Sequence, residues 1–166
     1  MFIQCTKKLA IAAKLPIETF HESELADFYD WHANLFTYNR RKGIMLINNA
    51  TRYSIFLYGL KAAEFKKLDS IILEAIKETF LAEGFSEKQV DLYIEKCDSI
   101  KYTKTNSRSL VTQMALIEDY MKCFIEDYLP NETFNIVDLN RLCGRYMLGG
   151  SFRCYPIDLL KEKMNS

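Results

Sequence analysis

Residues 31–58 read WHANLFTYNRRKGIMLINNATRYSIFLY and contain three segments rich in β-branched and aromatic residues. The segments are 31–38, 43–47 and 52–58, and a short polar connection of hairpin length separates each from the next. Such segments are typical of β-strands, and connections this short join antiparallel neighbours. The sequence therefore predicts an antiparallel β-meander, to which residues 2–5 add a further short strand.

After Gly59 the hydrophobic period changes from two residues to about 3.6, which indicates helices. Helices are predicted over 68–84, 86–97, 106–129, 139–147 and 156–163, with a short strand at 100–103 between the second and third. Ser86 and Gln89 have the spacing of a capping box. Because strands come first and helices follow, the predicted fold class is α+β. We expect an N-terminal antiparallel meander of about three to five strands, packed through one face against about five mostly C-terminal helices.

Composition narrows the class of protein. The chain has 166 residues, 22 Lys+Arg against 22 Asp+Glu, and 49% hydrophobic residues. One domain is expected over 1–166, with strands mainly in 1–60 and helices mainly in 61–166. The apolar content excludes a disordered chain, and the longest uncharged stretch, 43–51, is too short to span a membrane. A net charge of zero argues against a protein whose main work is to coat nucleic acid.

The first residues of the sequence and its cysteines predict a cytoplasmic protein. The first eight residues place apolar side chains before basic ones, the reverse of a secretory signal. The five cysteines show no spacing typical of a zinc site, so buried thiols in a reducing compartment are the simplest interpretation. With only two histidines and no phosphate-binding glycine loop, we expect no metal and no cofactor.

Basic residues are concentrated at two places. Arg40, Arg41 and Lys42 follow Asn39 at the predicted hairpin tip, while Lys104 and Arg108 flank Asn106 before a predicted helix. A helix start offers free N–H groups to an anion, arginine offers paired donors and lysine a point charge. Together they predict a phosphate site. Alternatively, the tip is basic for solubility, and Asn106 or Ser107 is only a helix cap.

His32 and Asn34 are the other candidates. Strand alternation places them on the side opposite Trp31, Ala33 and Leu35, so they face a cleft or solvent if that apolar set faces the core. A neutral histidine is a candidate general base near pH 7, and Arg40 or Lys104 is then a candidate to stabilise developing negative charge. A Cys5–His32 pair of nucleophile and base is a weaker alternative. A histidine satisfied by one internal hydrogen bond is the structural alternative.

Several short motifs, taken in order, resemble one family. They are Met1–Leu9, Trp31–Leu35, Asn39–Lys42, Thr51–Tyr53 and Thr103–Ser109. In this combination the chain is similar to a family of small bacterial proteins described only as a domain of unknown function. The resemblance implies one fold and a bacterial cytosolic setting, and it supplies no reaction. His32, Asn34, Arg40, Arg41, Lys42, Lys104, Asn106 and Arg108 fall within these motifs.

Three functions remain open from the sequence. The leading one is a binding module for a phosphate-bearing ligand, either a nucleotide or nucleic acid. The second is a small hydrolase or nuclease-like enzyme with His32 as general base. The third is a protein-interaction module that uses an aromatic surface of Tyr53, Phe56 and Tyr58. The polar motifs are also compatible with an internal hydrogen-bond network.

Overall fold

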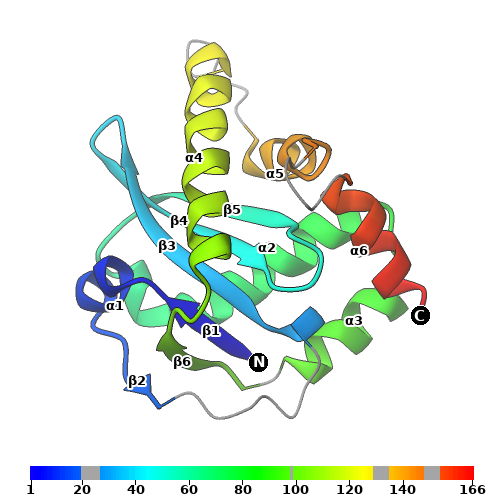
Figure 1. The fold of residues 1–166 in the computed structure, drawn as a ribbon, viewed down its shortest axis with the longest axis horizontal. Helices are drawn as coiled ribbons and strands as arrows, with labels where there is room; N and C mark the ends of the chain where they lie inside the picture. The colour runs from blue at the N-terminus through cyan, green and yellow to red at the C-terminus, as the bar shows by residue number, and fades with distance from the viewer. Residues whose placement is uncertain (20–26, 98, 129–134, 148–153) are drawn as a thin grey trace.

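The computed structural model describes residues 1–19, 27–97, 99–128, 135–147 and 154–166. Within these ranges one sheet forms the centre, with strand order β2-β6-β1-β3-β4-β5 (Figure 1). The strands are β1 (Phe2–Cys5), β2 (Ile17–Glu18), β3 (Trp31–Tyr38), β4 (Arg41–Asn48), β5 (Ser54–Leu60) and β6 (Lys101–Lys104). The predicted antiparallel meander is confirmed as β3-β4-β5. However, β1 runs parallel to both β3 and β6, and β2 runs parallel to β6.

The helices after β5 lie close to the predicted ranges, and α1 is an additional helix that the sequence analysis does not predict. The helices are α1 (Lys7–Ala13), α2 (Leu68–Ala82), α3 (Glu87–Lys96), α4 (Arg108–Tyr128), α5 (Ile136–Gly144) and α6 (Pro156–Met164). The 3₁₀ helices η1 (Asp27–Tyr29) and η2 (Glu64–Lys67) are shorter. The capping box of Ser86 and Gln89 is confirmed at the start of α3. In the described residues no helix combines the length and apolarity needed to cross a membrane.

Helices cover both faces of the sheet, which corrects the expectation of one covered face. On the first face, Trp31 and Leu35 belong to a core completed by α1, α2, α3 and α6. On the second face, Phe36 and Met45 belong to a core completed by α4 and α5. In Figure 1, α4 crosses the sheet over β3 and β4. Successive residues of β3 therefore face opposite sides of the sheet, one toward each core.

This two-sided packing also overturns two surface predictions. His32 was expected in a cleft or in solvent, but it is fully buried beneath the second face. Tyr53 and Phe56 are equally buried, so they do not form the aromatic surface proposed for a protein partner. Of that set only Tyr58 is partly exposed, and it stacks parallel to Phe36 with ring centroids 6.1 Å apart.

The β3–β4 hairpin closes in a tight turn at its tip. Tyr38 pairs with Arg41, which leaves Asn39 and Arg40 as a two-residue turn. Both turn residues have positive φ, 45° and 61°, as a type I′ hairpin turn requires. The twist of such a turn matches the right-handed twist of the strands. The turn and the start of β4 therefore place the three consecutive basic residues Arg40, Arg41 and Lys42 at the end of the sheet.

Gly43→Ala tests how closely the hairpin strands pack. A Cβ at Gly43 would lie 2.2 Å from Cζ of its cross-strand partner Phe36 and 2.5 Å from the backbone oxygen of Leu57. Because the backbone oxygen cannot move away, we expect the free energy of unfolding to fall by about 1–3 kcal/mol, the usual cost of overpacking. Urea denaturation measures this loss. An unchanged midpoint with an unchanged slope would contradict the close approach of these strands.

Candidate functional site

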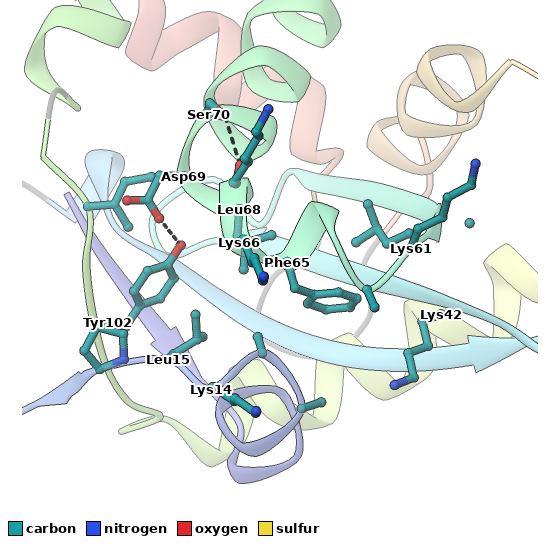
Figure 2. A pocket seen from close by; sticks show the side chains of 18 of the residues that line it. Lys14, Leu15, Lys42, Lys61, Phe65, Lys66, Leu68, Asp69, Ser70 and Tyr102 are labelled. Carbon is teal, nitrogen blue, oxygen red and sulfur yellow. Dashed lines mark hydrogen bonds between the residues drawn. The ribbon is translucent and has the colours of Figure 1, made fainter.

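A basic groove opens on the first face of the sheet, between α1, the β3–β4 turn and the start of α2 (Figure 2). Its volume is about 1470 Å³, whereas most small-molecule pockets measure roughly 300–1,000 Å³. Seven exposed basic side chains line it: Lys14, Arg40, Arg41, Lys42, Lys61, Lys66 and Lys67. Among the described lining residues, Asp69 is the single acidic one. We call this surface the basic groove.

The sheet topology brings three separate segments to this groove. Because β1 and β3 are parallel, α1 after β1 and the turn after β3 lie toward the same end of the sheet. Because β5 is antiparallel to β4, its last residue, Leu60, pairs with Lys42 beside the turn. Lys61 and η2 then continue directly from Leu60 toward α2. Cations that are far apart in the sequence therefore surround one concavity.

The floor of the basic groove is largely apolar. Phe65 and Leu15 are half-buried in it, and Nζ of Lys42 lies 6.0 Å from the centroid of the Phe65 ring. Figure 2 shows Lys42 and Lys61 toward one end, and Tyr102 with Asp69 toward the other. There the hydroxyl of Tyr102 donates to Oδ1 of Asp69 at 2.5 Å. Burial first, and this bond second, raise the pKa of Tyr102, so its hydroxyl keeps its proton.

The cations of the basic groove lack acidic partners in the described part of the chain. None of the seven takes part in the ion pairs formed there, which involve Lys77, Lys122, Arg141 and Arg145. The nearby carboxylate of Glu64 accepts instead from the backbone N–H of Lys61, at 2.6 Å. The whole chain has a net charge of zero, yet seven of its 22 basic residues gather here. An anion bound between them would relieve their mutual repulsion.

Two of these cations occupy backbone conformations that favour glycine. Lys14 ends α1 in the left-handed region, with φ 53° and ψ 43°. Arg40 has φ 61° in the β3–β4 turn, at the position where asparagine–glycine turns place glycine. A left-handed conformation costs a residue with a Cβ about 1–2 kcal/mol. The chain therefore carries positive charge at positions where the backbone alone favours a residue without a side chain.

On the second face of the sheet, polar side chains form a row across three strands. Thr103 of β6 lies opposite Gln4 of β1, and Gln4 lies opposite His32 of β3. Each is at most 1% exposed. Asn49 connects two of them: its Nδ2 donates to Oε1 of Gln4 at 3.0 Å, and its Oδ1 lies 2.8 Å from Nδ1 of His32. We call Gln4, His32, Asn49 and Thr103 the polar row.

The bond to Asn49 determines the tautomer of His32. An amide oxygen only accepts, so Nδ1 carries the ring proton and Nε2 is left as an acceptor. Burial lowers the pKa of His32, and it outweighs the opposite effect of hydrogen bonding by Asn49 and Asn106. Nε2 is buried and forms no well-directed hydrogen bond with a described residue. His32 is thus a neutral imidazole within the polar row.

Asn34 connects β3 to two neighbouring elements. Its Oδ1 accepts from the hydroxyl of Thr6 at 2.8 Å, and its Nδ2 donates to Oε2 of Glu118 at 3.4 Å. Glu118 in turn pairs with Lys122 at 2.9 Å. The same hydroxyl of Thr6 caps α1 by accepting from the N–H of Leu9. Asn34 therefore links α1 and α4 to the sheet.

The structure separates the predicted site residues into two groups. Arg40, Arg41 and Lys42 line the basic groove, whereas Lys104, Asn106 and Arg108 do not. Arg108 is the first residue of α4, which packs against the second face of the sheet. His32 and Asn34 lie on the second face, so His32 and Arg40 do not share one site.

The sequence prediction misses four cations of the basic groove: Lys14, Lys61, Lys66 and Lys67. Lys61, Lys66 and Lys67 form a basic segment directly after the predicted strand 52–58, which is the one local signal. Lys14 has no such signal, since its position depends on α1, which the sequence pattern does not predict.

The predicted Cys5–His32 pair is wrong. Alternation along β1 directs Cys5 into the first core, whereas His32 faces the second. The buried Sγ of Cys5 lies 3.6 Å from the backbone oxygen of Ile3, and burial raises the pKa of this thiol to about 12. Cys5 is therefore a protonated core side chain and not a nucleophile.

The basic groove and the polar row both lie within a range that matches a known family. The family described as domain of unknown function DUF6933 matches residues 2–159, which is most of the chain. The chain belongs to this family. The predicted resemblance to a domain of unknown function is thereby confirmed. No curated protein matches the chain.

His32 should make the stability of this DUF6933 domain sensitive to acid. Its pKa is lowered in the folded state, so the unfolded chain, with an ordinary histidine pKa of about 6.5, takes up the proton first. The stability that neutral His32 contributes is therefore present above pH ~6.5 and lost as the pH falls through its folded pKa. His32→Gln should flatten the fall in unfolding free energy between about pH 7 and pH 5.

Urea denaturation at several pH values measures this slope. His21→Gln, which removes the other histidine and leaves His32 in place, is the matched control. An identical slope in wild-type protein and His32→Gln would show that His32 is not held neutral by the fold.

Proposed function

We propose that this protein binds a phosphate-bearing ligand, a nucleotide or nucleic acid, in the basic groove. The observation that carries the proposal is the gathering of seven cations, without described acidic partners, around one concavity of a chain with zero net charge. Arginine donors at the β3–β4 turn suit paired contacts with phosphate oxygens, and the lysines of η2 supply point charges. Lys104, Asn106 and Arg108 are not part of the proposed site.

Binding is favoured over catalysis by what lines the groove. Its described lining includes no histidine and no cysteine, and the hydroxyl of Ser70 is engaged with the backbone oxygen of Lys67 at 2.9 Å. The cations can hold negative charge, but no described group there is suited to accept a proton near pH 7. The alternative of a hydrolase with His32 as general base lacks this support, because His32 is buried on the other face.

Backbone strain is an independent reason to assign function to the basic groove. Lys14 and Arg40 keep a charged side chain in the left-handed region, where glycine would be less costly. Strain of this kind is common at functional sites, although Arg52, which lies outside the groove, has the same left-handed conformation with φ 62°. A bacterial, cytoplasmic setting belongs to the same proposal. Its cytoplasmic part agrees with the five free cysteines, all of which lie in the described ranges.

Arg40→Gly should separate stability from binding. Glycine accepts the positive φ at position 40 more readily, so we expect the free energy of unfolding to rise by up to about 1 kcal/mol. Losing the guanidinium should weaken binding of ATP or inorganic tripolyphosphate about threefold to tenfold, as the removal of roughly 1 kcal/mol of charge interaction predicts. Calorimetric titration at low salt and urea denaturation measure the two effects.

Three further variants complete the test. Arg40→Lys keeps both the charge and the strained position, so it should keep the wild-type stability and weaken binding less than Arg40→Gly does, since lysine supplies the charge without the paired donors. Arg41→Ala should weaken binding without the gain in stability. Arg108→Ala removes an exposed cation outside the basic groove and should leave binding unchanged. If Arg108→Ala weakens binding as much as Arg41→Ala, or if no polyphosphate binds, the assignment of the groove fails.

A further inference from the structure

We propose that the ligand of the basic groove is a single strand of nucleic acid and not a mononucleotide. This inference rests on the proposed function and names the class of ligand more closely. It is carried by three features of the groove: its length, the way its helix end is occupied, and its apolar floor.

The groove is long in the direction of the strands. Its lining extends from Tyr102 in β6 to Arg40 at the β3–β4 turn. The register of β6, β1 and β3 makes Tyr102 level with Trp31, and β3 extends from Trp31 over roughly 23 Å to Tyr38, beside the turn that holds Arg40. Each strand of a B-form duplex carries a charge about every 3.4 Å along its axis. An extended single strand spaces its phosphates more widely, and a few phosphates fit along this span.

The number and distribution of cations agree with this length. Lys14, the turn and the 61–67 segment place positive charge on different sides of the groove. Seven cations exceed the negative charge of a nucleoside triphosphate. A polyanion whose phosphates are spaced along a chain can contact cations from all three segments, whereas the phosphates of one nucleotide are confined to one end of the ligand.

The helix end in the groove is not built as a phosphate cradle. Mononucleotide sites commonly hold phosphates on the free N–H groups of a helix N-terminus that follows a glycine-rich loop. Here α2 begins after Lys66 and Lys67, and its first turn carries the carboxylate of Asp69. That carboxylate repels a phosphate from the helix start and accepts from Tyr102. The positive charges that remain available to phosphate are therefore lysine and arginine side chains. Such mobile side chains suit the flexible sugar–phosphate backbone of a single strand.

The apolar floor favours a single strand over a duplex. Phe65, Leu15 and Leu60 are half-buried between the cations, where the bases of a single strand can turn toward them. Single-strand binding surfaces typically combine a basic groove with aromatic or apolar contacts to bases. A duplex hides its bases and offers phosphate on a convex surface, so it would leave this floor uncovered.

The test is a titration by fluorescence anisotropy with labelled oligothymidylate and oligouridylate of 4, 8, 12 and 16 nucleotides. Affinity should rise with length until the groove is filled. The logarithm of the binding constant should fall with the logarithm of salt concentration, at a slope of roughly −0.7 for each phosphate contacted. Four to seven contacts therefore predict a slope between about −3 and −5.

Variants then locate the contacts. Arg41→Ala and Lys66→Ala should each make the slope less steep by about 0.7, because each removes one cation. Phe65→Leu should weaken binding with an unchanged slope, because it removes an aromatic contact and no charge. Arg108→Ala, outside the groove, should change neither quantity.

Competition separates failure of this inference from failure of the proposed function. If ATP displaces the oligonucleotide at equal phosphate concentration and length has no effect, the ligand is a mononucleotide and this inference is overturned, while the proposed function stands. If a duplex of the same length binds as tightly as the single strand, the inference is again overturned. If neither oligonucleotide nor ATP nor tripolyphosphate binds, both proposals are overturned.

Discussion

The burial of β3 on both faces is the constraint on which the rest of the structure depends. Successive side chains of a strand point to opposite faces, so Trp31 and Leu35 enter one core while Phe36 enters the other. Such a strand cannot shift by one residue, since a shift would exchange the contents of the two cores. β1 and β4 pair with it on either side, and their registers follow. The position of the β3–β4 turn, and with it Arg40 and Arg41, is fixed by the same register.

Burial of β3 on both faces also removes its polar side chains from water, so these side chains need hydrogen-bond partners within the protein. His32 and Asn34 occupy the face that α4 covers, where an unbonded polar group is destabilising. Asn49 supplies the bond to His32, and its loop is shaped by Asn48, whose Oδ1 accepts from the N–H groups of Ala50 and Thr51 at 3.1 and 2.9 Å. The polar motifs on this face therefore act as an internal network that joins loops and helices to the sheet.

The meander and the later helices could be predicted because their signals are local. Residues 31–58 carry the strands and turns in their own composition, and the capping box at Ser86 or the proline at 156 marks a helix start directly. α1 gave no comparable signal, because its seven residues bury only Leu9 and its N3 residue is not Glu or Gln. β2 has two residues and exists through its pairing with β6. The parallel pairing of β1 depends on contacts between residues about 30 or 100 positions apart, which no local pattern records.

The same difference between local signals and long-range contacts explains which residues of the candidate site could be predicted. The cations of the β3–β4 turn were predictable because the hairpin was, but the turn's neighbours across the groove depend on the sheet order. Lys104 and Arg108 were grouped with the turn by chemistry alone, and neither residue lines the basic groove. Neither core includes the exposed cations of the groove, and two of those cations occupy costly backbone conformations. Neither the two cores nor an ion pair among the described residues accounts for these cations. The proposal that they hold an anionic ligand rests on this observation, and the sheet contributes to it by placing the cations around the end of β3.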